Sequence, residues 1–263
     1  MKIDFAARAD TGARAENDDR VLIDGRILDG NAHSGTLELP AIAVVCDGCG
    51  GYRGGGVAAE TVLQCLAEHT PEALSDAETL AQALDDCERK VAEEKLKLPH
   101  FSEMCTTVAG CVFTNGTILF FHSGDSRVYR CDRWGIAKMT RDHSTVQDMI
   151  DLGEITPEEA LVHPRRNVIN RCIGINCPPP EIYVSHASIQ PEEKYLLCSD
   201  GLWESISDAG IKAILDSDLP LPQMIDALFD TALRQGADDN ISVCICAAQG
   251  TLETVEQKPF ILD

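Results

Sequence analysis

Short apolar runs of the kind that form β-strands occur in groups along this chain, instead of alternating one by one with helices. Six of them stand out: AIAVVC (41–46), TTVAGCVF (106–113), TILFFH (117–122), RVYR (127–130), KYLLCS (194–199) and ISVCICA (241–247). Asn115-Gly116 joins the second run to the third at the spacing of a hairpin, which favours antiparallel pairing. Grouped strands predict antiparallel sheets covered by helices, in the α+β class, rather than a doubly wound parallel sheet.

Amphipathic helices are expected between these strand groups. Residues 56–69 and 222–235 carry apolar side chains at helical spacing. A further helix is predicted to begin at a capping box made by Ser75 and Glu78. Four apolar residues follow on one face of that helix: Leu80, Leu84, Cys87 and Val91.

Residues 141–177 differ in kind from the rest of the chain. Thr156 is placed to cap a short helix, with Pro157 at its first position and Glu159 reaching back. We expect this segment to form a small helical flap between two strand groups, where it would shape access to a site. No internal repeat, low-complexity tract or linker interrupts the sequence, so residues 1–263 are interpreted as a single domain.

Charge and cysteine content narrow the possible partners and the compartment. The chain has 22 basic and 43 acidic residues, for a formal charge of −21. Such a surface repels nucleic acid and anionic membranes, so neither is an expected partner. The N-terminus lacks an apolar signal region, and the 12 cysteines then indicate a reducing compartment. We therefore expect a cytoplasmic protein, and a monomer.

Two aspartates occupy the same position after an apolar run. Asp47-Gly48 follows AVVC, and Asp200-Gly201 follows LLCS. Asp-Gly is also a strong hairpin signal, so a plain turn is the alternative interpretation. In neither case does a returning strand follow directly. A carboxylate at the end of a buried strand needs a partner, which favours a functional role.

Further acidic residues lie in similar places. Asp18 and Asp19 follow Asn17 near the N-terminus, Asp125 lies between two strand-like runs, and Asp239 directly precedes Asn240 and the last run. Carboxylates that converge from strand ends form an oxygen-rich cage suited to Mg²⁺ or Mn²⁺. Several acids around two shared ions are typical of a two-metal hydrolytic centre.

These residues carry a resemblance to a known family. The motifs are Arg14-x-x-Asn17-Asp18-Asp19, Asp47-Gly48-x-Gly50-Gly51, Gly124-Asp125-Ser126-Arg127, Ser199-Asp200-Gly201-Leu202 and Asp239-Asn240. In order and spacing they resemble the successive motifs of metal-dependent PP2C-type (PPM family) serine/threonine protein phosphatases. The flap sequence is similar to that of bacterial members. The resemblance covers nearly the whole chain.

The resemblance implies an αββα sandwich, in which two stacked antiparallel sheets are flanked by helices, with a dinuclear centre at one end. The aspartate that matches Asp47 bridges both metals, and the glycine that matches Gly48 offers its carbonyl oxygen. Asp200 and Asp239 match ligands of the first metal. Asp125, with Asp200, matches the site of a weaker third metal.

The same resemblance assigns roles near the N-terminus. Asp19 matches a residue that binds the second metal directly or through water, whereas Asp18 stands where many relatives carry Glu or Gln. Arg14 matches the guanidinium that grips phosphate oxygens, and its alternative role is a surface pair with Glu16. Arg127 is interpreted as a structural residue that holds the Asp125 turn.

The function that follows is hydrolysis of phosphoserine and phosphothreonine in proteins, by attack of a water that bridges two Mn²⁺ or Mg²⁺ ions. Phosphoproteins, including a serine/threonine protein kinase, are the expected partners. A PP2C-like sensor or binding module with little catalysis is the alternative. Five carboxylate motifs argue against this alternative, because a binding module without catalytic activity has no need to keep so many acidic residues close together.

Cys46 and Cys49 flank Asp47 as a C-x-x-C pair, which also occurs in zinc and dithiol redox sites. A structural zinc site usually takes four ligands from paired motifs, and no second C-x-x-C occurs. The sulfurs are therefore interpreted as incidental. Cys49 stands where eukaryotic relatives carry a histidine proposed to protonate the leaving group. A metal-bound water, His143 or His163 is the substitute considered.

Overall fold

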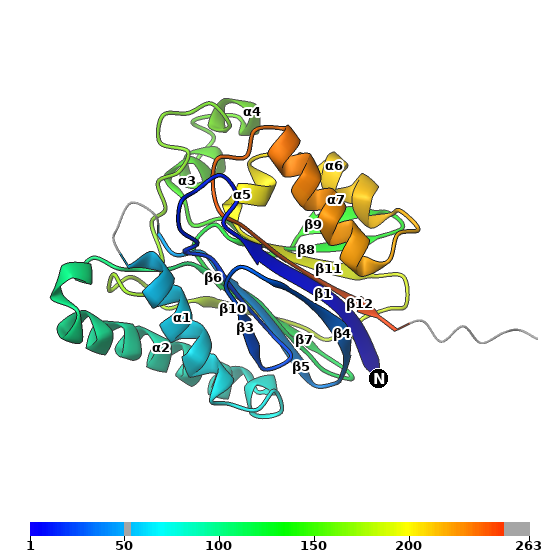
Figure 1. The fold of residues 1–263 in the computed structure, drawn as a ribbon, viewed down its shortest axis with the longest axis horizontal. Helices are drawn as coiled ribbons and strands as arrows, with labels where there is room; N and C mark the ends of the chain where they lie inside the picture. The colour runs from blue at the N-terminus through cyan, green and yellow to red at the C-terminus, as the bar shows by residue number, and fades with distance from the viewer. Residues whose placement is uncertain (50–53, 250–263) are drawn as a thin grey trace, which may run out of the picture.

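Two six-stranded sheets lie face to face in the computed structural model, which describes residues 1–49 and 54–249 (Figure 1). The first sheet has the order β4 (Ala32–Glu38), β1 (Lys2–Asp10), β12 (Ile241–Ala248), β11 (Lys194–Cys198), β8 (Arg127–Asp132), β9 (Gly135–Lys138). The second has the order β10 (Glu181–Ser185), β7 (Ile118–Ser123), β6 (Val108–Phe113), β5 (Ala41–Cys46), β2 (Arg20–Ile23), β3 (Arg26–Leu28). All neighbouring strands pair antiparallel, which confirms the predicted fold class.

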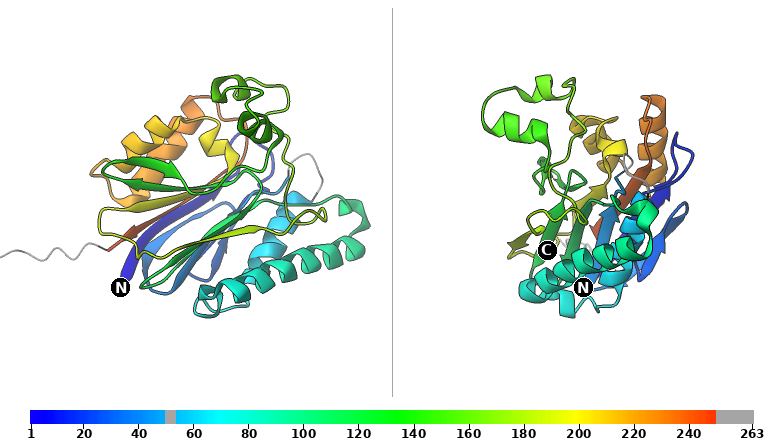
Figure 2. Two further views of the ribbon diagram at one scale, coloured as in Figure 1. Left: turned by 180° about the vertical axis from the view of Figure 1, so that it is seen from behind. Right: turned by 90° about the vertical axis from the view of Figure 1, so that its left-hand side faces the viewer.

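Helices cover the two outer faces of the sandwich (Figure 2). α1 (Gly55–Ala67) and α2 (Ala77–Lys97) pack on the second sheet, and α5 (Asp200–Trp203), α6 (Asp208–Leu215) and α7 (Leu221–Arg234) pack on the first. Short 3₁₀ turns span Ala73–Ser75 and Pro99–Phe101. In the described part of the chain, none of the helices has the length and apolar character needed to span a membrane.

Strand alternation explains why the chain forms three apolar layers. In β5, Ile42 and Val44 face the helices α1 and α2, whereas Ala43 and Val45 face the other sheet. Successive side chains of a strand point to opposite faces, so a run that is apolar throughout must be covered on both sides. All six residues of β5 are buried. The resulting layers hold the strand ends that carry the acidic residues in a fixed frame.

The local predictions can be compared with the structure residue by residue. The hairpin at Asn115-Gly116 is confirmed, because β6 and β7 pair antiparallel around it. The capping box at Ser75 is wrong by one residue. Asp76 is the N-cap of α2 and accepts from the amide of Thr79 at 2.8 Å, while Ser75 Oγ donates to the carbonyl of Pro71. The carboxylate of Asp76 accepts more strongly than a hydroxyl at a helix N-terminus.

The flap contains two short helices, α3 (Thr145–Asp151) and α4 (Pro157–Ala160), at one end of the sandwich (Figure 2). The capping box of α4 is present as predicted, with Thr156 and Glu159 bonding reciprocally. Isolated bridges tie the flap to itself and to the sandwich, between Ser144 and Ile169 and between Thr106 and Ile173. The division of residues 1–263 into one domain stays a prediction, since residues 250–263 lie outside the described range.

The close approach of β6 and β7 depends on Gly110. A Cβ atom placed on it would lie 2.2 Å from the ring of Phe121, which is fully buried. We expect Gly110→Ala to lower the free energy of unfolding by about 1–3 kcal/mol, because the ring cannot move without repacking its layer. Gly116→Ala is the matched control, since nothing lies within 4 Å of its Cβ position. Equal denaturation midpoints for the two variants in urea would contradict this account.

Candidate metal centre

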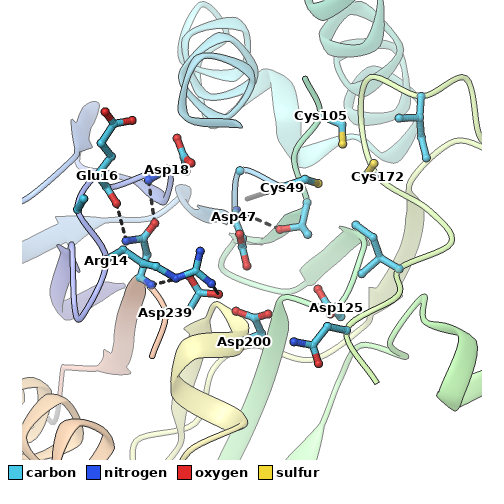
Figure 3. A pocket seen from close by; sticks show the side chains of 17 residues that line it. Arg14, Glu16, Asp18, Asp47, Cys49, Cys105, Asp125, Cys172, Asp200 and Asp239 are labelled. Atoms are coloured by element: carbon cyan, nitrogen blue, oxygen red, sulfur yellow. Dashed lines mark hydrogen bonds and ion pairs between the residues drawn. The ribbon is translucent and has the colours of Figure 1, made fainter. Parts of the chain in front are cut away.

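Strand ends from both sheets meet at one rim of the sandwich, and the predicted acidic residues lie there (Figure 3). Asp47 directly follows β5, and Asp19 directly precedes β2. Asp125 lies in the turn between β7 and β8, Asp200 begins α5 after β11, and Asp239 lies two residues before β12. The stacking of the sheets therefore brings together carboxylates that are as much as 220 positions apart in the sequence.

The residues predicted from the sequence share one cavity of about 620 Å³. Seven of the eight line it: Arg14, Asp18, Asp47, Gly48, Asp125, Asp200 and Asp239. Asp19 is 1% exposed and is absent from the described residues that line the cavity. The cavity wall also includes the flap residues Asn167, Ile169 and Ile175. Gly50 and Gly51 of the Asp47 motif lie outside the described residues.

The backbone around Asp47 is bound on every side, and this leaves its carboxylate free. Asp47 donates its amide to Thr107 Oγ1 at 3.0 Å, and its carbonyl accepts from Thr107 N at 2.8 Å and from Thr106 Oγ1 at 2.9 Å. A Cβ on Gly48 would lie 2.2 Å from the carbonyl carbon of Gly55, so only glycine fits between this loop and α1. Among the described residues, no side chain donates a hydrogen bond to the carboxylate of Asp47.

The pKa values of the carboxylates in the cavity indicate that the site favours bound cations. Burial and, next, the negative charges of neighbouring carboxylates hold the pKa values of Asp47 and Asp200 well above their usual range. Burial is also the largest cause that raises the pKa of Asp19 and of Asp125 to about 7. Buried carboxylates are costly unless a cation compensates them. Oxygen ligands in this number fit hard divalent cations, so the residues present match the implied Mn²⁺ or Mg²⁺.

The spacing of the carboxylates is wider than that of a single-ion cage. In the described ranges 1–49 and 54–249, no three of them bring an oxygen atom each within 4.8 Å of one another. Two ions in a shared centre lie about 3.5–4 Å apart, so their ligands must surround a longer volume. Mutual repulsion between the carboxylates also favours a wider spacing.

Asp19 is positioned by serines from the neighbouring sheet. Ser199 Oγ donates to Asp19 Oδ2 at 2.7 Å and accepts from the amide of Ser242 at 3.0 Å. This bond lowers the pKa of Asp19, and burial outweighs it. The hydroxyl of Ser199 therefore fixes one carboxylate oxygen of Asp19 while joining β11 to β12.

Asn240 attaches the N-terminal acidic loop to the start of β12. Its Nδ2 donates to the carbonyls of Thr11 and Glu16, both at 2.8 Å, and its Oδ1 accepts from the amide of Asp18 at 2.9 Å. Asp18 Oδ1 in turn accepts from the amide of Gly56 at 2.8 Å, in the first turn of α1. Asp18 thus compensates unpaired amides at a helix N-terminus while it lines the cavity.

Arg14 lies at the rim of the cavity and pairs with a different acid from the one considered in the sequence. Its Nη2 bonds Asp239 Oδ2 at 2.8 Å, and its Nε donates to the carbonyl of Asp238 at 2.9 Å (Figure 3). The alternative pair with Glu16 is not formed. In the described part of the chain, Nη1 of Arg14 has no hydrogen-bond partner.

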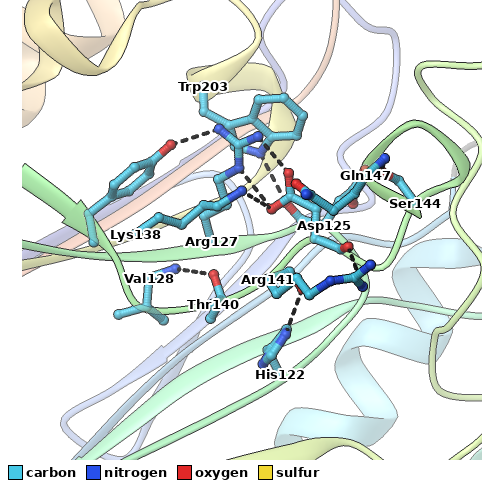
Figure 4. Close-up of polar contacts among 12 residues, drawn as sticks. His122, Asp125, Arg127, Val128, Lys138, Thr140, Arg141, Ser144, Gln147 and Trp203 are labelled. Carbon is cyan, nitrogen blue, oxygen red and sulfur yellow. Dashed lines mark hydrogen bonds and ion pairs between the residues drawn. The ribbon is translucent and has the colours of Figure 1, made fainter. Parts of the chain in front are cut away.

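The turn that carries Asp125 is held by an ion pair and a tryptophan (Figure 4). Arg127 donates from Nε and Nη2 to both carboxylate oxygens of Asp142, at 3.0 and 2.6 Å. Its guanidinium lies 3.4 Å from the centre of the Trp203 ring, and Trp203 Nε1 donates to the carbonyl of Asp125 at 3.0 Å. Arg127 therefore supports the turn through Asp142 and Trp203 rather than by bonding Asp125.

The two flap histidines considered as proton donors are absent from the described residues that line the cavity. His143 is 1% exposed, stacks on His122 with ring centres 4.5 Å apart, and accepts from the amide of Gly124 through Nδ1. His163 Nδ1 accepts from the amide of Arg165. Burial lowers the pKa of His143 to about 4, which suits a neutral structural ring.

Several residues of the site were not found by sequence reasoning. Asp142 and Trp203 carry no motif signal of their own, because their roles depend on an arginine 15 and 76 positions away. Cys105 and Cys172 line the cavity beside Cys49, although the sequence separates them by 67 positions. Their proximity can be seen only in the structure, where short paired backbone segments bring these residues together.

The raised pKa values of the acids predict how stability depends on pH. A carboxyl whose folded pKa exceeds its unfolded value of 3.8 stabilises the fold below that value and loses this contribution as pH rises through the folded pKa. The free energy of unfolding of metal-free protein should therefore fall between about pH 4 and about pH 7.

Asp47→Asn should raise the melting temperature of metal-free protein at about pH 7.5, because it removes one of the repelling carboxylates. Added Mn²⁺ should stabilise the parent more than the variant. Differential scanning calorimetry at several pH values measures both effects. A melting temperature of the metal-free parent that rises steadily from pH 4 to pH 7 would show that the carboxylates do not repel as described.

Asn240→Ala removes a side chain that satisfies three backbone groups of the acidic loop. We expect it to lower the free energy of unfolding by about 2–3 kcal/mol and to weaken metal binding, since the loop that carries Asp18 and Asp19 loses its attachment. Asn31→Ala, at an exposed position, is the control. Urea unfolding and calorimetric titration with Mn²⁺ test this, and unchanged values for Asn240→Ala would refute it.

Comparison with known proteins identifies the family of this chain. The family model described as "Protein phosphatase 2C" matches residues 28–243. Serine/threonine protein phosphatase PstP of Mycobacterium tuberculosis is 32% identical over 249 residues, 92% of this chain and 44% of PstP, so this chain spans less than half of that relative. Serine/threonine phosphatase stp of Listeria innocua is 30% identical over 84% of this chain and 91% of its own length.

Solved structures lead to the same family. The crystal structure of Mycobacterium tuberculosis PstP has a TM-score of 0.82 at 29% identity, covering 95% of this chain and 100% of that one. The catalytic domain of PstP in complex with 2 manganese ions has a TM-score of 0.76 at 29% identity, covering 94% and 99% of the two chains. With a family model over most of the sequence, the same sandwich and one acidic cavity at its rim, the chain belongs to the protein phosphatase 2C family.

Proposed function

We propose that this chain is a metal-dependent protein serine/threonine phosphatase. The observation that carries the proposal is the group of carboxylates that repel one another at the rim of the sandwich, in which Asp47 and Asp200 lack a cationic partner among the described residues. Such a set is stable only around cations, and Mn²⁺ or Mg²⁺ fits its oxygen ligands. The relatives named as serine/threonine phosphatases, one of them solved with manganese, support the reaction.

Each residue of the site is assigned a role from its position in the cavity. Asp47, Asp200 and Asp239 would hold the cations, with the carbonyl of Gly48 as a further oxygen ligand, and Asp19 would bind a cation directly or through water. Bound divalent ions acidify water and neutralise charge around a phosphoryl group. Asp125 lies on the flap side of the cavity and is assigned to a weaker third ion.

Arg14 is proposed to bind the phosphate of the substrate. Its side chain lies at the cavity rim and is 46% exposed, and its guanidinium is already oriented by Asp238 and Asp239. The free Nη1 can donate to a phosphate oxygen while the other nitrogens keep their bonds. A planar guanidinium held in this way binds an oxyanion with little loss of side-chain entropy.

The flap supplies the rest of the substrate surface. Asn167, Ile169 and Ile175 line the cavity together with Arg14 and add one polar and two apolar side chains to its wall. An open, mixed surface of this kind fits a peptide that carries the phosphate, rather than a small metabolite enclosed on all sides. Phosphoproteins, including a serine/threonine kinase whose products this enzyme removes, are the proposed partners. The cytoplasmic location and the monomeric state stay predictions.

Hydrolysis of a phosphothreonine peptide by the purified chain tests the proposal. We expect turnover with Mn²⁺ or Mg²⁺ and none after chelation, with activity restored by adding the metal back. Asp47→Asn should lower kcat/KM at least about 1,000-fold, because it removes a carboxylate that would hold the cations. Release of inorganic phosphate measures these rates.

Asp85→Asn provides the matched control, because Asp85 is exposed on α2, far from the cavity. This variant should keep the parent rate. Peptide binding without any turnover at saturating Mn²⁺ would favour the alternative, a PP2C-like binding module. Full activity after complete metal removal would overturn the assignment of the carboxylates.

A further inference from the structure

Three cysteine thiols meet in the wall of the cavity, beside the carboxylates (Figure 3). Cys49 follows Gly48 in the loop after β5, Cys105 lies just before β6, and Cys172 lies in the returning part of the flap. Their sulfur atoms all lie within 4.8 Å of one another. Cys46, the other half of the C-x-x-C pair, is not part of this group and lies buried in β5.

The local backbone explains why the three sulfurs share a face. An antiparallel bridge pairs Gly48 with Thr106, so Cys49 lies opposite Cys105. A second bridge pairs Thr106 with Ile173, so Cys172 lies opposite the residue two positions beyond Cys105. Residues two apart on a strand point to the same side, and directly opposed and diagonal neighbours are within side-chain reach.

Hydrogen bonds fix this small ladder. Cys49 N donates to the carbonyl of Cys105 at 3.0 Å, while Thr106 and Ile173 exchange two bonds at 3.0 and 2.8 Å. Cys105 and Cys172 are each 1% exposed, and Cys49 is half-buried. The sulfurs therefore lie at set positions in the wall of the cavity.

The hydrogen bonding of these thiols differs from that of the buried pair Cys65 and Cys87. Cys65 donates to the carbonyl of Ala83 and Cys87 to that of Val62, as expected for small buried residues. Among the described residues, no oxygen atom accepts from the sulfur of Cys49, Cys105 or Cys172. Three thiols directed at one another without an oxygen acceptor form a ligand set that nothing in the phosphatase chemistry uses.

We propose that Cys49, Cys105 and Cys172 bind a zinc ion. Zinc takes thiolate ligands at about 2.3 Å, which places the sulfurs of a tetrahedral site about 3.8 Å apart. The sulfurs need only a small contraction from their present spacing, and the ion displaces their protons to solution. The fourth position faces the cavity and is open to water or to a phosphate oxygen. Under this proposal Cys49 has a ligand role of its own, which the sequence interpretation did not assign to it.

The zinc site is chemically distinct from the carboxylate centre a short distance away. Thiolates select zinc and similar soft ions, whereas carboxylates and carbonyls select Mg²⁺ and Mn²⁺. The proposal does not rest on the phosphatase assignment, because it depends only on the positions of the three sulfurs. Since Cys172 belongs to the flap and the other two belong to the sandwich, the bound ion would tie the base of the flap to the cavity wall.

Cobalt titration of the reduced, metal-free chain tests the proposal. Co²⁺ bound by thiolates absorbs strongly through sulfur-to-metal charge transfer, and Co²⁺ bound by carboxylates does not. We expect a charge-transfer band that saturates at one ion per chain and disappears when Zn²⁺ is added. Cys49→Ser, Cys105→Ser and Cys172→Ser should each weaken cobalt binding at least tenfold. Cys131→Ser, a buried cysteine elsewhere, should leave it unchanged.

Alkylation of the unmodified chain gives a second measurement that does not depend on the folding of variants. Zn²⁺ should slow the reaction of all three thiols with N-ethylmaleimide, as mapped by mass spectrometry, while half-buried Cys177 reacts at its original rate. The absence of a charge-transfer band in the fully reduced parent overturns the proposal. Full cobalt affinity in all three serine variants, or protection of Cys177 equal to that of the three, also overturns it.

Discussion

Repulsion between buried carboxylates is the constraint on which the rest of this structure depends. Asp19 and Asp125 are almost fully buried, and the pKa values of Asp47 and Asp200 are raised by burial and by one another. A chain that folds around such a group gives up stability in the absence of metal. The two apolar outer layers and the layer between the sheets must supply enough free energy to hold the rim together.

Among the described residues, the surrounding hydrogen bonds satisfy the backbone and leave the carboxylates of Asp47, Asp125 and Asp200 free. Thr107 binds the amide and carbonyl of Asp47, and Trp203 binds the carbonyl of Asp125. Asn240 binds the loop of Asp18 and Asp19 through main-chain groups only. This pattern preorganises the oxygen ligands without using their lone pairs, which is what a site for divalent cations requires. Three other acids do accept hydrogen bonds through their carboxylates. Asp19 accepts from Ser199, Asp18 accepts from the amide of Gly56, and Asp239 accepts from Arg14 and from the amide of Asn240.

The fold class and much of the site could be predicted from the sequence, each for a different physical reason. The apolar runs in β5, β6 and β12 are buried on both faces, so their composition predicts strands directly. The edge strands β4 and β10 were missed because most of their residues are exposed or half-buried, and their alternation is weak. The acidic residues were found because each follows or precedes a strand. The ion pair of Arg127 with Asp142, by contrast, has no local signal.

The C-x-x-C motif shows that sequence spacing can point to a clustered cysteine, Cys49, and still give it the wrong partner, Cys46. Cys46 and Cys49 have the spacing of a metal motif, yet successive residues of an extended strand point to opposite faces, and Cys46 lies in the layer under α1. Cys49 meets Cys105 and Cys172 instead, through a ladder of single bridges that no sequence window contains. Hard oxygen ligands and soft sulfur ligands thus occupy different walls of one cavity. Thiolates prefer soft ions such as zinc, whereas carboxylates prefer hard ions such as Mg²⁺ and Mn²⁺. The two sets of ligands can therefore coexist without competing for the same ion.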